Sequence, residues 1–141
     1  MSRKKLTQLL LLTLLPYFSG CSKSSGASAE NGEPELECKK PITKEEMSLD
    51  PDEVHAIIES NLQPLQMCYE RVLAMNPALE GQIDVNLVVE PNGTPSMVCS
   101  SSTSLASSKV VSCVLRTIAR IQFPERDEQV ATVYPLSFSP G

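Results

Sequence analysis

The chain has 141 residues, with 12 basic and 17 acidic side chains and a formal net charge of −5. This acidic balance argues against nucleic-acid binding and against direct attachment to anionic lipid surfaces, since both depend on clustered Lys and Arg. The length allows one small domain, and the five cysteines are an odd number that requires an explanation in an exported protein.

The first twenty residues have the three parts of a secretory signal. A cationic segment at residues 2–5 precedes an apolar run at residues 6–15, and Pro16 ends that run. A membrane-spanning helix needs roughly 20 apolar residues, so this run is too short to remain as an anchor. We therefore predict that residues 1–20 are a signal peptide. Its removal takes three of the 12 basic residues and none of the 17 acidic ones, which changes the net charge from −5 to −8.

The segment Phe18-Ser19-Gly20-Cys21 follows the apolar run and resembles the lipobox of bacterial lipoproteins. The resemblance implies that Cys21 becomes the first residue of the mature chain and carries several acyl chains, palmitate among them, which makes anchoring stable. Ser22, in place of Asp, implies sorting to the outer membrane. The alternative is cleavage by the ordinary signal peptidase, which would leave Cys21 as a free thiol.

Residues 21–49 contain mostly Ser, Gly, Ala, Glu and Lys, with few bulky apolar side chains. Such a composition cannot bury enough surface to offset the entropy of ordering. We interpret residues 21–49 as a flexible tether and residues 50–141 as the domain that it carries.

The domain is predicted to begin with a helix. Asp50 can cap it, Pro51 suits its first turn, and Glu53 stands where a capping-box carboxylate bonds back to the cap. Pro64 interrupts the apolar stripe of this helix, and we expect a kink or a division near Gln63. The stripe consists of Val54, Ile57, Ile58, Leu62, Leu65, Cys68, Val72 and Met75.

A hairpin is predicted next. Residues 81–90 alternate between apolar and polar side chains, as in a half-buried strand, and Asn92-Gly93 favours a tight turn. The return strand is expected from Pro95 to about Ser101, and the serines of residues 100–104 are interpreted as a flexible polar loop.

A second helix is predicted to begin near Ser107 or Ser108 and to end at Phe123-Pro124. A last strand is expected at residues 129–138. Its Pro135 has no N–H to donate to a neighbouring strand, which favours a position at the edge of a sheet.

The expected fold class is therefore α+β, in the order helix-strand-strand-helix-strand. The three strands would form an antiparallel or mixed sheet with the first strand in the middle, and both helices would cover one face.

Several short segments between residues 54 and 139 occur in a suggestive order and spacing. They are Cys68-Tyr69-Glu70, Asn76-Pro77, Gly81, Pro91-Asn92-Gly93, Cys113-Val114, Phe123-Pro124 and Tyr134-Pro135-Leu136-Ser137-Phe138. Together they resemble the AgmX/PglI C-terminal domain family, a TonB-like C-terminal domain common in envelope proteins. The resemblance implies a TonB-like fold and an envelope location, and it implies no reaction.

The cysteines other than Cys21 can form two disulfides in three ways. We favour Cys68–Cys113, because the resemblance places a cysteine pair there and because it would join the two helices. The remaining pair would be Cys38–Cys99, which would fasten the tether to the sheet.

No combination of residues predicts catalysis, a metal site or a cofactor. The chain has no Cys-x-x-Cys sequence, its single histidine is His55, and the serines of residues 100–104 lie in no nucleophile motif. The alternative that stays open is a small envelope enzyme that acts by thiol redox chemistry or as a serine hydrolase.

The sequence thus favours a non-catalytic module that binds an envelope protein or peptide, or has a structural role in an envelope, motility or transport assembly. We expect it on the periplasmic side of the bacterial outer membrane. An exposed sheet edge can accept an extended peptide as an added strand. The residues expected to form the contact surface are Val130, Thr132, Tyr134, Pro135 and Leu136.

Overall fold

The structure is a computed structural model that describes residues 36–141. The predictions for the signal peptide, for Cys21 and for tether residues 21–35 fall outside the described residues.

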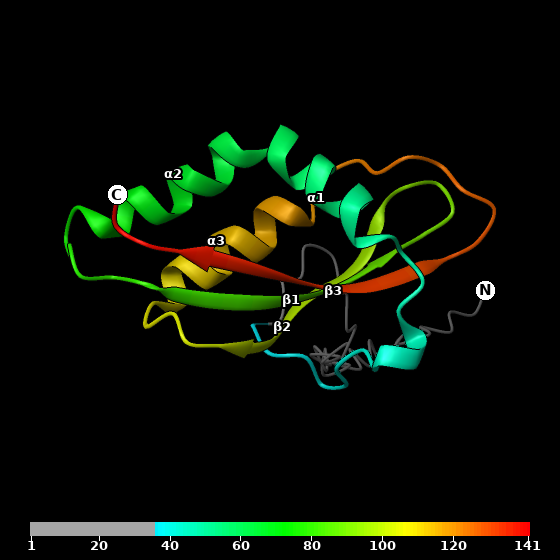
Figure 1. The fold of residues 1–141 in the computed structure, drawn as a ribbon, viewed down its shortest axis with the longest axis horizontal. Helices are drawn as coiled ribbons and strands as arrows, with labels where there is room; N and C mark the ends of the chain where they lie inside the picture. The colour runs from blue at the N-terminus through cyan, green and yellow to red at the C-terminus, as the bar shows by residue number, and fades with distance from the viewer. Residues whose placement is uncertain (1–35) are drawn as a thin grey trace, which may run out of the picture.

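Within residues 36–141, three α-helices, one short 3-10 helix and a three-stranded sheet make up the domain (Figure 1). The elements are η1 (Lys44–Glu46), α1 (Pro51–Ser60), α2 (Leu62–Leu73), β1 (Gly81–Val89), β2 (Pro95–Thr103), α3 (Ser108–Ile118) and β3 (Val130–Phe138). The sheet is antiparallel with the order β2-β1-β3, and α1, α2 and α3 lie on one face of it. The predicted α+β fold with the first strand in the middle is confirmed.

The predicted first helix is divided into α1 and α2 at Asn61, three residues before Pro64. The proline ring would clash with the carbonyl of Ser60 if the helix continued. In the first turn of α2 its missing N–H breaks no hydrogen bond. Asp50 caps α1 as predicted, because its carboxylate accepts the N–H of Asp52 at 2.9 Å.

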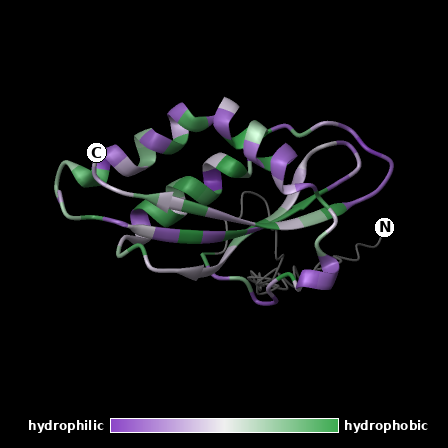
Figure 2. Ribbon diagram, in the orientation of Figure 1, coloured by the Kyte–Doolittle hydropathy of each residue, from purple (hydrophilic) through white to green (hydrophobic). Residues whose placement is uncertain are grey.

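The hydrophobic core lies between the sheet and the helices. On β1 the side chains that face the helices are at most 1% exposed, and they are Ile83, Val85, Leu87 and Val89. Helix α3 packs against β2 and α2. Figure 2 shows that α3 is largely hydrophobic, whereas α1 and α2 carry many hydrophilic residues. Helix α3 therefore buries the larger apolar face, although its Lys109 and Arg116 are exposed, and α1 and α2 present more polar surface to solvent.

The predicted hairpin forms, but residues 90–94 connect its strands in place of a two-residue turn. Gly93 has a φ of +81°, and its carbonyl accepts the N–H of Phe123 at 2.9 Å. This bond ties the chain after α3 to the hairpin, so α3 ends at Ile118 and not at Phe123 as predicted. Strand β2 continues to Thr103, so most of the predicted serine loop belongs to a strand.

Residues 36–49, which we call the N-terminal arm, cross the face of the sheet opposite the helices (Figure 1). At the β2 edge the N–H of Cys38 bonds to the carbonyl of Ser100 at 2.9 Å. On the same face of the sheet, the N–H of Ile42 bonds at 2.7 Å to Oδ1 of Asn86, a buried residue of the central strand β1. The tether prediction is therefore wrong for residues 36–49, which are held by backbone hydrogen bonds that composition does not reveal.

Candidate functional site

The outer edge of β3 is the candidate site. The edge position predicted from Pro135 is confirmed by the strand order. The backbone groups of Ala131 bond to Ser48 and not to β1, so they point outward. Because the direction alternates along an antiparallel strand, Val133, Pro135 and Ser137 also direct their backbone groups outward.

The N-terminal arm covers the first part of this edge. The carbonyl of Ala131 accepts the N–H groups of Ser48 at 2.9 Å and Leu49 at 3.1 Å. The N–H of Ala131 donates to the hydroxyl of Ser48 at 3.1 Å. Within residues 36–141, no backbone group of another segment is hydrogen-bonded to the outward-pointing backbone groups of residues 133–137. The open section of the edge is therefore residues 133–137.

The five residues predicted as the contact surface differ in exposure. Val130, Thr132 and Leu136 are 7%, 1% and 9% exposed, because their side chains face the helices. Tyr134 is half-buried on the same face, and Pro135 is exposed. A partner at this edge would therefore contact the backbone, Pro135 and the rim of Tyr134.

Helix α1 places a polar group beside the open edge. Nδ1 of His55 lies 2.6 Å from the hydroxyl of Tyr134, and its Nε2 lies 3.2 Å from Oε1 of Glu59. Burial raises the pKa of the Tyr134 hydroxyl, and the negative charge of Glu59 raises it further. This contact joins residues 79 positions apart in the sequence, so no local pattern could predict it.

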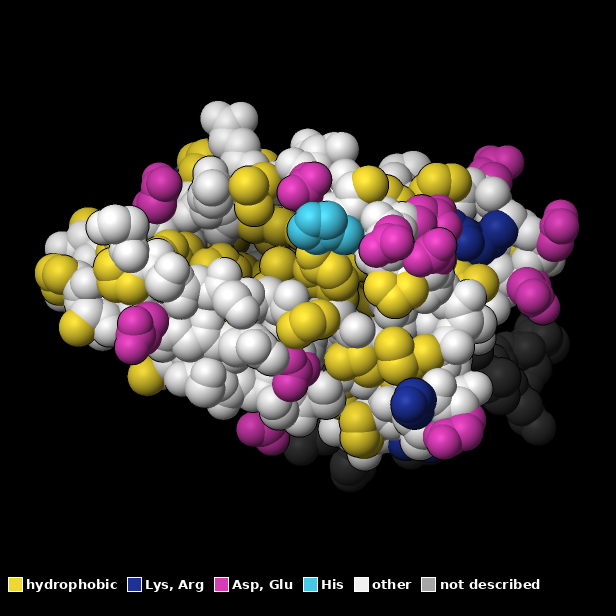
Figure 3. All heavy atoms as spheres, viewed as in Figure 1, with side chains coloured by type: hydrophobic (Ala, Val, Ile, Leu, Met, Phe, Trp, Pro, Cys, Tyr) yellow, Lys and Arg dark blue, Asp and Glu magenta, His cyan; other side chains and the backbone are white. Residues whose placement is uncertain are grey.

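A hydrophobic hollow lies between α1–α2 and β3. Figure 3 shows the histidine in cyan at its rim, with acidic side chains in magenta on either side. The rings of Tyr69 on α2 and Phe138 on β3 have their centroids 5.3 Å apart. The hydroxyl of Tyr69 donates to the carbonyl of Leu79, and burial, followed by the charge of Glu80, raises its pKa. The hollow thus has the aromatic side chains of Tyr134 and Phe138 along β3 and the carboxylate of Glu59 beside His55 at its rim.

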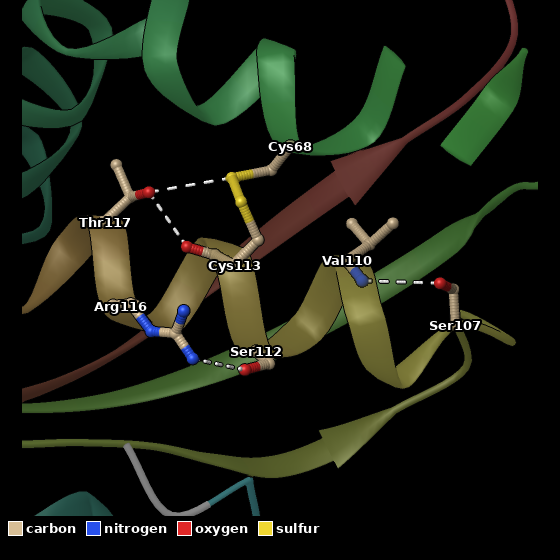
Figure 4. Close-up of a disulfide and its surroundings, with 7 residues drawn as sticks. All are labelled: Cys68, Ser107, Val110, Ser112, Cys113, Arg116 and Thr117. Carbon is tan, nitrogen blue, oxygen red and sulfur yellow. Dashed lines mark hydrogen bonds between the residues drawn. A yellow bond between two sulfur atoms is a disulfide. The ribbon is translucent and has the colours of Figure 1, made fainter. Parts of the chain in front are cut away.

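The four cysteines of residues 36–141 form two disulfides, Cys68–Cys113 and Cys38–Cys99. Both predicted pairings are confirmed. In Figure 4 the first disulfide joins α2 to α3, and the hydroxyl of Thr117 lies 3.6 Å from Sγ of Cys68. Thr117 also donates to the carbonyl of Cys113 at 2.8 Å. The two disulfides thus link α2 to α3 and the N-terminal arm to β2.

The other residues considered for catalysis lie apart. Ser100 donates to the carbonyl of Ser102 at 2.9 Å, and Ser102 donates to Asp84 at 2.8 Å, both on the β2 side of the sheet. His55 lies at the opposite edge, beside β3. Within residues 36–141, no group of three or more His, Cys, Asp or Glu side chains could hold a metal ion. None of the helices described there is long and apolar enough to cross a membrane.

No family model matches the chain, so membership of the AgmX/PglI family is not confirmed. Over 101 residues the chain is 29% identical to the tyrosine-protein kinase MasK of Myxococcus xanthus. The similar region covers 71% of this chain but 15% of the kinase, so the chain spans a small part of that protein.

Two solved structures of the Helicobacter pylori TonB C-terminal domain are also similar. The first has a TM-score of 0.47 and 16% identity, and it covers 59% of this chain and 92% of that domain. The second has a TM-score of 0.43 and 16% identity, and it covers 65% of this chain and 95% of its own.

Proposed function

We propose that this protein binds an extended protein or peptide segment at the open edge of β3 and catalyses no reaction. The observation that best supports the proposal is the outward direction of the backbone groups of residues 133–137, next to a section covered by the N-terminal arm. An unpaired strand edge is a template for one more strand, and main-chain hydrogen bonds then supply affinity.

The proposed location is the periplasmic side of the outer membrane, with the mature chain anchored through lipid on Cys21. Two disulfides in a domain of this size are typical of oxidising compartments outside the cytoplasm. The partner is an envelope protein or peptide, and the setting that we propose is an envelope, motility or transport assembly.

Substitution of Val133 tests the edge directly. Val133→Pro removes an N–H that points outward, so the hydrogen bonds between β3 and β1 remain, as they do at Pro135 two residues later. Val133→Thr keeps the N–H and the β-branched shape and is the matched control. In crosslinking and pull-down from envelope extracts, a partner captured by the native chain should be lost with proline and retained with threonine. Equal capture by both variants would overturn binding at this edge.

A further inference from the structure

We infer that the segment bound at β3 is about five residues long and carries a basic side chain two positions away from a large apolar one. This inference rests on the proposed function and adds the chemistry of the partner.

The length follows from the ends of the open section. Ser48 and Leu49 already bond to Ala131, so an added strand cannot extend past Val133 without displacing the N-terminal arm. Val133 and Ser137 each offer an N–H and a carbonyl, whereas Pro135 offers a carbonyl only. The segment residue opposite Pro135 can therefore donate its N–H to the carbonyl of Pro135, but its own carbonyl receives no N–H from Pro135. Residues 133–137 thus allow pairing with about five residues.

The spacing follows from the alternation of side chains along strands. Segment residues opposite Tyr134 and Leu136 direct their side chains toward the helices, and they are two positions apart. Segment residues opposite Val133, Pro135 and Ser137 point to the other face. Only two positions of a five-residue segment therefore enter the hollow between α1–α2 and β3.

The position opposite Leu136 favours a large apolar side chain. Phe138 is its diagonal neighbour, and diagonal neighbours on a sheet are within reach of large side chains. The Phe138 ring is half-buried and packs against Tyr69 of α2. Figure 3 shows hydrophobic side chains in the hollow. A Leu or Phe of the segment would bury apolar surface on these rings.

The position opposite Tyr134 favours Lys or Arg. Its stem can lie on the Tyr134 ring while its charged head reaches Glu59 on α1. The Glu59 side chain is 64% exposed, and its contact with His55 is made through Oε1, so its carboxylate is accessible to a cation. The effect of Glu59 on the pKa of Tyr134 is consistent with a negative potential at this point. Residues 36–141 also contain fourteen acidic and eight basic side chains, which favours a cationic partner.

The test uses labelled synthetic peptides and the mature full-length chain with its disulfides intact. The two probes contain Leu-Ser-Arg for antiparallel pairing and Arg-Ser-Leu for parallel pairing, between flanking Gly and Ser residues. One control replaces Arg by Glu, and another places Arg and Leu side by side. Fluorescence polarisation gives affinity, and amide chemical shifts show where the peptide binds.

We expect at least one probe to bind at residues 133–137 at least tenfold more tightly than either control peptide. The Glu59→Gln variant should lose the preference for Arg over Glu. The Glu125→Gln variant, which changes an exposed carboxylate in the loop before β3, should keep it. Because both carboxylates are exposed, both variants should melt at the native temperature.

Two results would overturn the inference. One is binding of all peptides at residues 133–137 with equal affinity, which would leave the proposed function intact. The other is failure of both probes to shift these amides, while the native chain still captures a partner that Val133→Pro loses. If capture is instead insensitive to Val133→Pro, the proposed function itself fails.

Discussion

Gly93 connects the hairpin loop between β1 and β2 to the chain that follows α3. Its φ of +81° is a conformation that side chains with a Cβ rarely adopt, and its carbonyl holds the N–H of Phe123. A Cβ at Gly93 would lie 2.0 Å from the carbonyl oxygen of Phe123, which is backbone and cannot rotate away. The position therefore requires glycine for both its conformation and its surroundings.

We predict that Gly93→Ala lowers the free energy of unfolding by about 2 kcal/mol or more, from a strained backbone and a lost hydrogen bond. Urea unfolding of the two proteins measures the difference. Gly141→Ala is the control, because no atom lies within 4 Å of its added Cβ. If Gly93→Ala were as stable as the native chain, the close contact between Gly93 and the backbone of Phe123 would be refuted.

Glu46 holds the turn of the N-terminal arm at η1. Its carboxylate accepts the N–H of Thr43 at 2.9 Å and the ammonium of Lys40 at 3.1 Å. Hydrogen bonding by Thr43, followed by that of Lys40, holds the pKa of Glu46 below its ordinary value of 4.5. A lowered folded-state pKa means that the stabilisation is present above pH 4.5 and is lost as the pH falls through the folded-state value.

We therefore predict that Glu46→Gln melts at a lower temperature than the native chain at pH 7, and that the gap closes under acid. Thermal unfolding followed by circular dichroism between pH 7 and pH 3 measures the gap. Glu45→Gln alters an exposed neighbouring carboxylate and should show no such pH dependence. A gap that widens on acidification would contradict the assignment.

At the scale of elements, α2 and α3 are joined by Cys68–Cys113. The 45-residue separation of these cysteines corresponds to a stabilisation of about 4 kcal/mol in the chain-entropy treatment. We predict that Cys68→Ala with Cys113→Ala lowers the free energy of unfolding by about that amount, as measured by urea unfolding. If the free energy of unfolding fell by less than about 1 kcal/mol, packing between α2 and α3 would hold the two helices together without the disulfide.

Local signals predicted the elements better than their ends. Asp50, the hairpin glycine and Pro135 act on neighbouring residues, so a helix start, a turn and an edge strand followed from the sequence. The predicted end of α3 was wrong, because the N–H of Phe123 bonds to the carbonyl of Gly93, which lies thirty residues earlier in the sequence. Contacts between distant segments decide such boundaries.

For the same reason, only part of the candidate site could be predicted from the sequence. The edge strand followed from Pro135, but the length of its open section depends on Ser48 and Leu49, which the composition assigned to a tether. The contact of His55 with Tyr134 joins a helix to a strand, and hydrophobic periodicity carries no signal for it.

For the whole molecule, the N-terminal arm covers the sheet face that the helices leave open. It bonds to β2 at Ser100, to β1 at Asn86 and to β3 at Ala131. Both edges of the sheet are thereby partly covered, which limits association of exposed strands. Residues 133–137 are the section of β3 that remains for a partner.

The proposed anchor predicts a covalent change at Cys21. Mass spectrometry of the mature N-terminus should find a chain that begins at Cys21 and carries acyl chains. Cys21→Ser should abolish the added mass and release the protein from membranes, because the domain itself carries an acidic excess. An unmodified Cys21 thiol in membrane-extracted protein would contradict the lipoprotein assignment.

Amide hydrogen exchange on the mature full-length protein tests the central claim, an open edge at β3, most directly. The amides of Val133 and Ser137 should exchange rapidly, since they point away from the sheet. Those of Thr132 and Tyr134 should exchange slowly because they face β1, and that of Ala131 should be protected by Ser48. If Val133 and Ser137 exchange as slowly as Thr132 in the absence of a partner, the edge is already covered and the account is wrong.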